Sequence, residues 1–388
     1  GVALISFTIG NFQNPDTAWE FKAANCVIMW GMPFVEVQGS LINQPPLGFY
    51  AEGLFLSIFG ATIETGTILI GLFALGCTLI LYQLGNLLYD KKTGLLASAL
   101  FALTPWQLVL SNSFLIDTQC LFFSVSSLYV GILSFRKRSD KLFAVSAALF
   151  ALAFYTKLFA LFTLIPLSLF YLYEQRSNLK SLPKTLTLFS LPIFFATLIW
   201  YAVDYFLMPY YLDKGIGYLF SHSDFNDLNA AGVVPSYSFV GTFLLDYGLG
   251  FFFVVAVVFC LVVGFAFRRQ LGNRFVVFDL FFLLSILFVA GLTMFLGVTQ
   301  NLKVPYTSAV KYLYQTLPLF CLIAASLAFK SSALIKSASL KHKKLFLTTS
   351  SFGFFLLALP LFSNALSAYQ LSLKEFIIFS VEPGKLLG

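Results

Sequence analysis

The chain has 388 residues, of which 59% are hydrophobic and only 11% are charged, and its mean hydropathy is +0.87. Soluble globular domains are nearer to about 45–50% apolar and about 25% charged, so this composition excludes an ordinary soluble enzyme and predicts an integral membrane protein. The apolar runs are too long and continuous for the alternating strands of an outer-membrane barrel.

Taken in chain order, the apolar runs predict an all-α fold, a polytopic transmembrane helix bundle of about eleven spans. The two runs at 142–157 and 158–173 are short, and the alternative is one long kinked span, which would reverse the direction of everything downstream. The expected spans are 1–10, 66–89, 93–110, 115–135, 142–157, 158–173, 185–206, 239–267, 275–297, 307–329 and 345–363.

Most Lys and Arg residues fall in one alternating set of loops, which the positive-inside rule places in the cytoplasm. The net charge of +7 then needs no nucleic-acid partner, because this basic rim faces anionic lipid. The opposite, extracytoplasmic side receives the loops 11–65 and 207–238 and a tail at 364–388. We expect residues 1–363 to form one transmembrane domain of a multi-pass plasma-membrane or inner-membrane protein.

Two carboxylates lie where an apolar span meets an extracytoplasmic loop, Asp16 and Asp117. Charge near a bilayer is costly and marks chemistry or a transport path. Asp16 opens the first of two short amphipathic helices expected within 11–65, which would lie in the membrane interface. Pro15 favours a helix start at this point. The structural alternative is that Asp16 only caps that helix.

An ordered set of motifs resembles the GT-C glycosyltransferases, in particular the dolichyl-phosphate-mannose protein mannosyltransferases and the aminoarabinose transferase of lipid A. The resemblance implies transfer of one sugar from a polyprenyl-phosphate carrier to an acceptor hydroxyl on a protein, lipid or glycan outside the cytoplasm. The motifs are Pro15-Asp16-Thr17, Gly31-Met32-Pro33-Phe34, Gln44-Pro45-Pro46-Leu47, Leu115-Ile116-Asp117-Thr118, Tyr155-Thr156-Lys157 and Lys311-Tyr312-Leu313-Tyr314.

The resemblance also implies roles for individual residues. Asp16 matches the proposed general base, which takes the proton of the acceptor hydroxyl. Asp117 matches a second acidic residue that orients the site or, with Asp16, holds a divalent metal such as Mg or Mn. Lys157 and Lys311 are the candidates for binding the donor phosphate, whose charge grows as the bond to the sugar breaks. The alternative for both lysines is snorkelling to lipid headgroups.

Three positions depart from the family pattern. Thr17 stands where the family has Glu, so one carboxylate is lost unless Glu20 substitutes for it. Gln44 replaces a His or Lys that precedes Pro-Pro, although we retain it as a candidate contact to the donor phosphate. Lys311 replaces an Arg and so lacks a bidentate grip on phosphate.

Further candidates for substrate binding come from aromatic and polar side chains on the predicted outer side. Aromatic residues also form ordinary interfacial belts, so this assignment is the weaker explanation for some of them. The candidates are Trp19, Glu20, Tyr50, His222 and Tyr312.

Two other functions compete with sugar transfer. The departures at Thr17 and Gln44 allow a catalytically inactive relative that serves as a lipid-binding or structural subunit of a membrane assembly. A lipid or sugar transporter would place polar groups near mid-span and show inverted repeats, whereas the acidic candidates here lie at span ends and no clear repeat is visible.

Overall fold

In the computed structural model of the protein the described residues are 15–33, 45–175, 182–207, 233–235, 277–289, 303–305 and 314–337. The predicted spans 1–10, 239–267 and 345–363 and the tail 364–388 lie outside these residues. So does most of the predicted loop 207–238.

The described residues are almost entirely helical, which agrees with the predicted all-α class. Two of the helices are long and apolar enough to cross a membrane, α4 and α7. The helices are α2 (Pro15–Trp30), α3 (Leu47–Phe59), α4 (Ile63–Leu88), α5 (Lys91–Leu103), α6 (Pro105–Ser111), α7 (Ile116–Lys137), α8 (Asp140–Thr156), the 3₁₀ helix η1 (Leu158–Thr163), α9 (Leu164–Glu174), α10 (Leu182–Leu207), Val277–Val289 and α17 (Leu317–Ser337).

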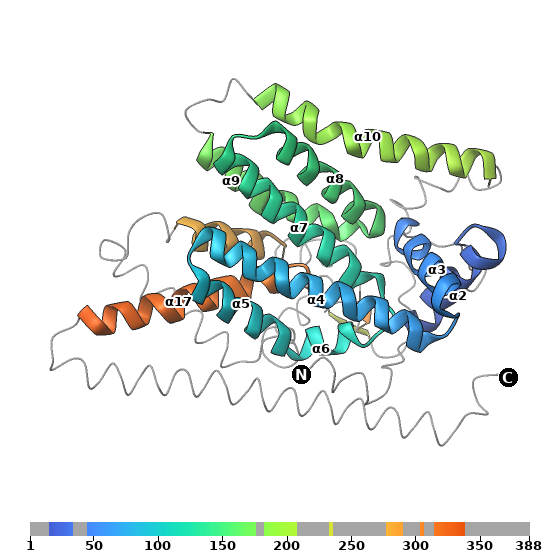
Figure 1. The fold of residues 1–388 in the computed structure, drawn as a ribbon, viewed down its shortest axis with the longest axis horizontal. Helices are drawn as coiled ribbons and strands as arrows, with labels where there is room; N and C mark the ends of the chain where they lie inside the picture. Colours follow the sequence, from blue (N-terminus) through green and yellow to red (C-terminus); the bar gives the residue numbers. More distant parts are fainter. Residues whose placement is uncertain are drawn as a thin grey trace, which may run out of the picture.

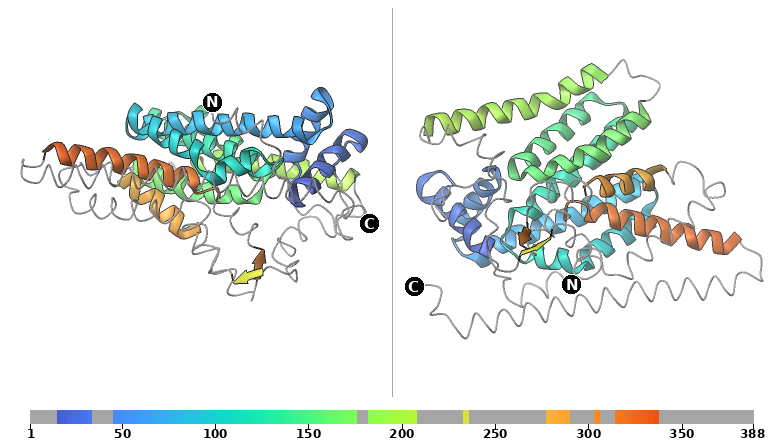
Figure 2. Two further views of the ribbon diagram at one scale, coloured as in Figure 1. Left: turned by 90° about the horizontal axis from the view of Figure 1, so that it is seen from below. Right: turned by 180° about the vertical axis from the view of Figure 1, so that it is seen from behind.

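Helix α7 lies in the middle of the bundle, with α4 on one side and α8 and α9 on the other (Figure 1). The short helices α2 and α3 pack together across one end of this bundle, beside the start of α4 (Figures 1 and 2). This arrangement places the first residues of α7, including Asp117, next to the two short helices.

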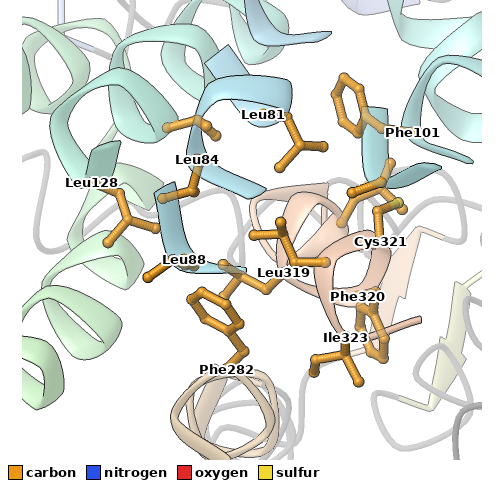
Figure 3. Packing of buried hydrophobic residues seen from close by; sticks show 14 of the residues in the cluster. Leu81, Leu84, Leu88, Phe101, Leu128, Phe282, Leu319, Phe320, Cys321 and Ile323 are labelled. Carbon is orange, nitrogen blue, oxygen red and sulfur yellow. The ribbon is translucent and has the colours of Figure 1, made fainter. Parts of the chain in front are cut away.

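The main core joins α4, α5 and α7 to the two late helices. Leu81, Leu84 and Leu88 of α4 meet the α17 side chains Leu319 and Ile323 and, from the helix Val277–Val289, Phe282 (Figure 3). These contacts span some 200 residues of sequence, so the late helices are integral to the bundle. Apolar burial of this kind stabilises the fold in proportion to the area removed from solvent.

Polar pairs also join neighbouring helices. Ser127 of α7 and Ser146 of α8 each donate a hydroxyl to the other's backbone carbonyl, at 2.8 and 2.7 Å. Small residues with such bonds let helices approach closely where lipid leaves no hydrophobic driving force between them.

The chain folds back between α8 and α9, as the prediction of two short spans requires. Phe143 at the start of α8 and Tyr171 at the end of α9 both pack on Phe135 of α7, with ring centroids 5.5 and 5.4 Å apart. A single long kinked helix could not bring both ends to one residue. Lys157 lies at the turn of this hairpin.

Two predicted boundaries were wrong. The span expected at 93–110 is two helices, because Thr104 is extended (φ −66°, ψ 131°) before Pro105, which disfavours a helical residue ahead of it. The loop expected from Lys330 onwards is helical as far as Ser337. Residues 331–337 contain neither Gly nor Pro, so nothing ends the helix there.

The two short helices predicted within the first loop are confirmed as α2 and α3. Helix α2 starts at Pro15, as expected, and is followed by Gly31 with φ of 74°. The outer face of α3 exposes apolar side chains, Leu54, Ile58 and Phe59. An exposed apolar face is what the predicted interfacial position requires.

A small strand pair adds to the helices. Val233–Pro235 (β1) pairs antiparallel with Lys303–Pro305 (β2), with Val234 opposite Val304. The pair stands off from the helical slab (Figure 2). It joins two segments that the charge pattern predicts to lie on the same side of the membrane.

Basic and acidic side chains gather at the other end of the bundle from α2 and α3. Asp279 accepts a hydrogen bond from Tyr89 at 2.6 Å and one from Ser326 at 3.2 Å, and it forms an ion pair with Lys330. Lys184 in the first turn of α10 and Asp140 at the start of α8 form an exposed ion pair. We call this the Asp279 end, and the opposite one the Asp117 end.

Candidate active site

A buried ion pair marks the Asp117 end. The Nζ of Lys157 lies 2.9 Å from Oδ2 of Asp117, and the two side chains are only 7% and 1% exposed. Removing two charges from water is expensive, and a short contact in a low-dielectric site recovers part of that cost. The pair joins the first turn of α7 to the tip of the α8–α9 hairpin.

The backbone presents Lys157 to α7. The residue ends α8 in an extended conformation (φ −158°, ψ 139°), so its side chain leaves the helix direction. Its carbonyl accepts a weak hydrogen bond from the Cys120 thiol at 3.7 Å, and its ammonium lies 5.4 Å from the ring centroid of Phe159. Contacts on both sides therefore hold the lysine at this position.

One oxygen of the ion pair is left over. Within the described residues Oδ1 of Asp117 is buried and has no hydrogen-bond partner. A buried carboxylate oxygen without a partner costs about 1–3 kcal/mol, and such costs concentrate at functional sites. The geometry is that of a carboxylate with one committed oxygen and one available oxygen.

Glu20 links α2 to the same helix start. Its Oε2 accepts a hydrogen bond from the backbone N–H of Ile116 at 2.8 Å. Ile116 is the first residue of α7, and Leu115 before it supplies no side-chain cap. A carboxylate at this point satisfies an N–H left open by the helix and is favoured by the helix dipole.

Tyr314 is a buried neighbour that the sequence reasoning did not single out. Its hydroxyl donates to Oε1 of Gln107 and lies 3.4 Å from the Thr118 hydroxyl, next to Asp117. Tyr314 follows Lys311 by three residues in the late motif. The late motif therefore contributes Tyr314 to the Asp117 end.

Glu52 and Gln119 were also missed, because they lie in apolar helical runs that look like packing. Both are fully buried, and among the described residues neither side chain has a hydrogen-bond partner. Burial, with the nearby Glu20 carboxylate, raises the pKa of Glu52 well above its ordinary value. The sequence signal that could have identified Glu52 is a single acidic residue within an otherwise largely apolar helix.

Two predicted substrate-binding side chains are described besides Glu20. Trp19 packs edge-on against Phe49, with centroids 5.7 Å apart, and so contributes to the α2–α3 contact. Tyr50 is half-buried on α3. Thr17 is buried, and its hydroxyl has no hydrogen-bond partner among the residues that the structure describes.

The remaining candidates cannot be placed in the site. Asp16 is the second residue of α2, but its side chain is outside the described part of the structure. Four others lie wholly outside it, namely Gln44, Lys311, His222 and Tyr312.

The predicted divalent metal depends on Asp117 and on Asp16, whose side chain lies outside the described residues. No group of three His, Cys, Asp or Glu side chains is placed there to hold an ion. Asp117 also commits one oxygen to Lys157. A metal held by Asp16 and Asp117 stays a prediction.

Comparison with known proteins gives the family resemblance a second source. Residues 43–200 match the family model described as dolichyl-phosphate-mannose-protein mannosyltransferase. The matched stretch contains α3 to α9 and with them both members of the buried ion pair. No curated protein matches the sequence at a significant level.

Solved structures agree over nearly the whole chain. The structure of ArnT from Cupriavidus metallidurans in the apo state has a TM-score of 0.65 at 13% identity and covers 96% of this chain and 73% of that one. At this identity the likeness shows that the two chains share a fold. ArnT bound to undecaprenyl phosphate gives a TM-score of 0.60 at 11% identity, again covering 96% of this chain and 73% of that one.

A third GT-C structure is more distant. It is the archaeal oligosaccharyltransferase AglB from Archaeoglobus fulgidus in complex with an inhibitory peptide and a dolichol-phosphate. Its TM-score is 0.54 at 14% identity, and the match covers 96% of this chain and 55% of that one. The predicted resemblance to GT-C mannosyltransferases and aminoarabinose transferases is thus confirmed. At such low identity the structural matches show a shared fold and do not show which reaction this protein catalyses.

Proposed function

We propose that this GT-C protein transfers a single sugar from a polyprenyl-phosphate donor to an acceptor hydroxyl on the extracytoplasmic face. The observation that carries the proposal is the buried Lys157–Asp117 pair at the end of the bundle where α2 carries Asp16. A cation, a carboxylate with an available oxygen and the proposed base thus belong to neighbouring elements.

In the proposed reaction Lys157 stabilises the donor phosphate. As the bond between sugar C1 and phosphate oxygen breaks, negative charge grows on the phosphate and a nearby cation stabilises it. In the proposed mechanism the phosphate takes the place of Asp117 beside Lys157, assisted by Lys311. The matched ArnT structure is bound to undecaprenyl phosphate and the AglB structure is in complex with a dolichol-phosphate, which supports this donor class.

The acceptor must lose a proton when the new bond forms. In the proposed mechanism Asp16 takes the proton from the acceptor hydroxyl, whose oxygen then bonds to C1 while the phosphate leaves. Asp117, displaced from Lys157 by the phosphate, orients the acceptor through its two oxygens.

The extracytoplasmic face follows from the charges. Basic residues cluster at the Asp279 end, where the loops after α4, α7 and α9 lie, and the positive-inside rule assigns that end to the cytoplasm. The Asp117 end then faces the opposite side.

A catalytically inactive relative is the second candidate, and Thr17 favours it. Thr17 carries a hydroxyl in place of a carboxylate, and its side chain is buried. Such a protein would bind the lipid phosphate without transferring sugar.

Purified protein in lipid nanodiscs tests both functions. It would receive a radiolabelled polyprenyl-phosphate hexose and a panel of protein, lipid and glycan acceptors, beside Asp16→Asn and Lys157→Met. We expect transfer by the wild type, a loss of about 10²–10⁴-fold in Asp16→Asn, and weaker donor binding in Lys157→Met.

Matched controls separate the site from charge in general. Glu64→Gln and Lys22→Met remove one exposed charge each from α4 and α2, and both should retain transfer. Equal transfer by Asp16→Asn and the wild type would refute the base. Tight donor binding without transfer by any form would favour the inactive relative.

A further inference from the structure

The junction of α2, α3 and α7 contains two buried glutamates that the proposed reaction does not use. Glu20 is 2% exposed and Glu52 is 0% exposed. The two differ in their partners. Glu20 accepts a hydrogen bond from Ile116, whereas neither oxygen of Glu52 has a partner among the described residues.

The Glu20 bond connects the two proposed catalytic carboxylates. Asp16 precedes Glu20 by four residues, one turn of the same helix, and Asp117 directly follows Ile116. A single hydrogen bond across 96 residues of sequence therefore joins the turn that carries Asp16 to the turn that carries Asp117. A shift of about 1 Å between catalytic groups can cost on the order of 10²-fold in rate.

The packing around this bond is close enough to transmit such a shift. A Cβ on Gly48 of α3 would lie 2.6 Å from Cγ2 of Ile116, and one on Gly53 would lie 2.8 Å from the carbonyl oxygen of Ala24 in α2. Phe21 of α2 packs edge-on against Phe114, with centroids 5.7 Å apart. The three helices are therefore closely packed on either side of Glu20.

Glu52 lies close to Glu20 and affects its surroundings. It follows Gly48 by four residues on the face of α3 that meets α7, and Glu20 is near enough to disfavour a second negative charge. Asp117 and Lys157 of the neighbouring elements pair with each other, and α2 also carries Asp16 and the exposed Lys22. Burial and the nearby Glu20 carboxylate both favour the uncharged form of Glu52.

We propose that Glu20 is a positioning residue that sets the separation of Asp16 and Asp117 by holding the start of α7, and that Glu52 supports it as a neutral carboxylic acid. Glu20 then acts through its hydrogen bond and neither moves a proton nor touches the sugar. This inference rests on the proposed transferase function.

The test compares Glu20→Gln, Glu20→Ala and Glu20→Asp with the wild type in the nanodisc assay. Glutamine keeps an acceptor oxygen at the same reach, so we expect kcat within about threefold of the wild type. Alanine removes the acceptor, and we expect kcat to fall on the order of 10²-fold with donor Kd unchanged. Aspartate is one methylene shorter, so Glu20→Asp should resemble Glu20→Ala. The aspartate variant replaces the alanine variant in the test if Glu20→Ala does not fold.

Hydrogen–deuterium exchange supplies a readout that needs no activity. A peptide containing Ile116 should exchange faster in Glu20→Ala than in the wild type, and Glu20→Gln should match the wild type. Glu52→Gln, a neutral isostere, should keep both the exchange rate and kcat.

Three results would overturn the proposal. Glu20→Gln as inactive as Asp16→Asn would make Glu20 a proton-transfer group. Unchanged kcat and exchange in Glu20→Ala would leave it without a positioning role, and a large loss in Glu52→Gln would show that its acidic proton is needed. If the wild type transfers no sugar, the proposed function fails, while the exchange comparison still decides whether Glu20 holds α7.

Discussion

Each end of the bundle contains a buried Asp–Lys pair, and the two pairs differ in how completely their polar atoms are satisfied. At the Asp279 end, both carboxylate oxygens are occupied, one by Tyr89 and the other by Ser326 and Lys330. At the Asp117 end, Lys157 occupies Oδ2, and within the described residues Oδ1 has no partner.

The partners also differ in what they join. Tyr89, Asp279 and Lys330 bind α4 and the two late helices into one unit, as a buried network with its bonds satisfied should. Asp117 and Lys157 lie at a helix start and a hairpin tip, where a small movement can separate them. We infer that the first pair holds the fold together and that the second is built to exchange partners with a substrate.

Loss of activity should separate the two pairs most strongly. Asp117→Asn should lower sugar transfer by about 10²–10³-fold, the usual cost of removing one preorganised polar group from a reaction site. Asp279→Asn, in protein that remains folded, should transfer at nearly the wild-type rate. The measurement is initial rate per folded molecule after size-exclusion chromatography, and equal losses in the two variants would remove the distinction.

Stability should show the reverse order. Asp279→Leu leaves Lys330 buried without its carboxylate, and we expect a loss of about 3–5 kcal/mol in the free energy of unfolding. The double variant Asp279→Leu with Lys330→Met should recover most of that loss, because an apolar pair replaces the buried charges. Thermal unfolding in detergent measures both, and a double variant no better than the single one would contradict the expectation.

The affinity for the donor lipid tests whether its phosphate replaces Asp117 as the partner of Lys157. If the donor phosphate replaces Asp117 beside Lys157, then Asp117→Asn removes the competitor. The Kd for undecaprenyl phosphate should then fall by about tenfold, or about 1.4 kcal/mol, although transfer is lost. A weaker Kd in this variant, measured by calorimetry or a lipid-binding assay, would mean that Asp117 orients Lys157 for the phosphate.

The smallest expected effect concerns pH at the α2–α3–α7 junction. The folded protein holds the pKa of Glu52 above its ordinary value. In the pH interval between the unfolded and the folded pKa, the native state therefore binds more protons than the unfolded state. Stability from this group is therefore complete at low pH and decreases as pH rises toward the folded pKa. Glu52→Gln should flatten the dependence of thermal stability on pH over that interval, while Glu64→Gln, a change at an exposed site, should not.

Much of the fold could be predicted from patterns along the chain. The apolar runs placed α4, α7, α8 and α10 within a few residues, and Pro15 correctly predicted where α2 begins. The single span expected at 93–110 failed because apolar periodicity does not register the backbone restriction that Pro105 places on Thr104. Motif order likewise led to Asp117 and Lys157 as site candidates.

The partners within the site could not be predicted in the same way. Lys157 and Asp117 are 40 residues apart, and either could have faced lipid headgroups by its sequence alone. Glu20 was taken for a substrate contact or a replacement carboxylate, while the structure shows its bond to Ile116. Glu52 and Tyr314 lie in apolar or motif segments, where no pattern distinguishes a buried polar partner from packing.

Composition and period by themselves determined that this is a helical membrane protein, because the cost of placing backbone and charge in lipid acts on every residue along the chain. Motif order added the GT-C resemblance. The tertiary structure alone decided which charges meet, since a contact such as Asp117–Lys157 depends on the hairpin of α8 and α9 returning Lys157 to the start of α7. The same contact pairs Oδ2 of Asp117, while Oδ1 has no partner among the described residues, and no local sequence property encodes this difference.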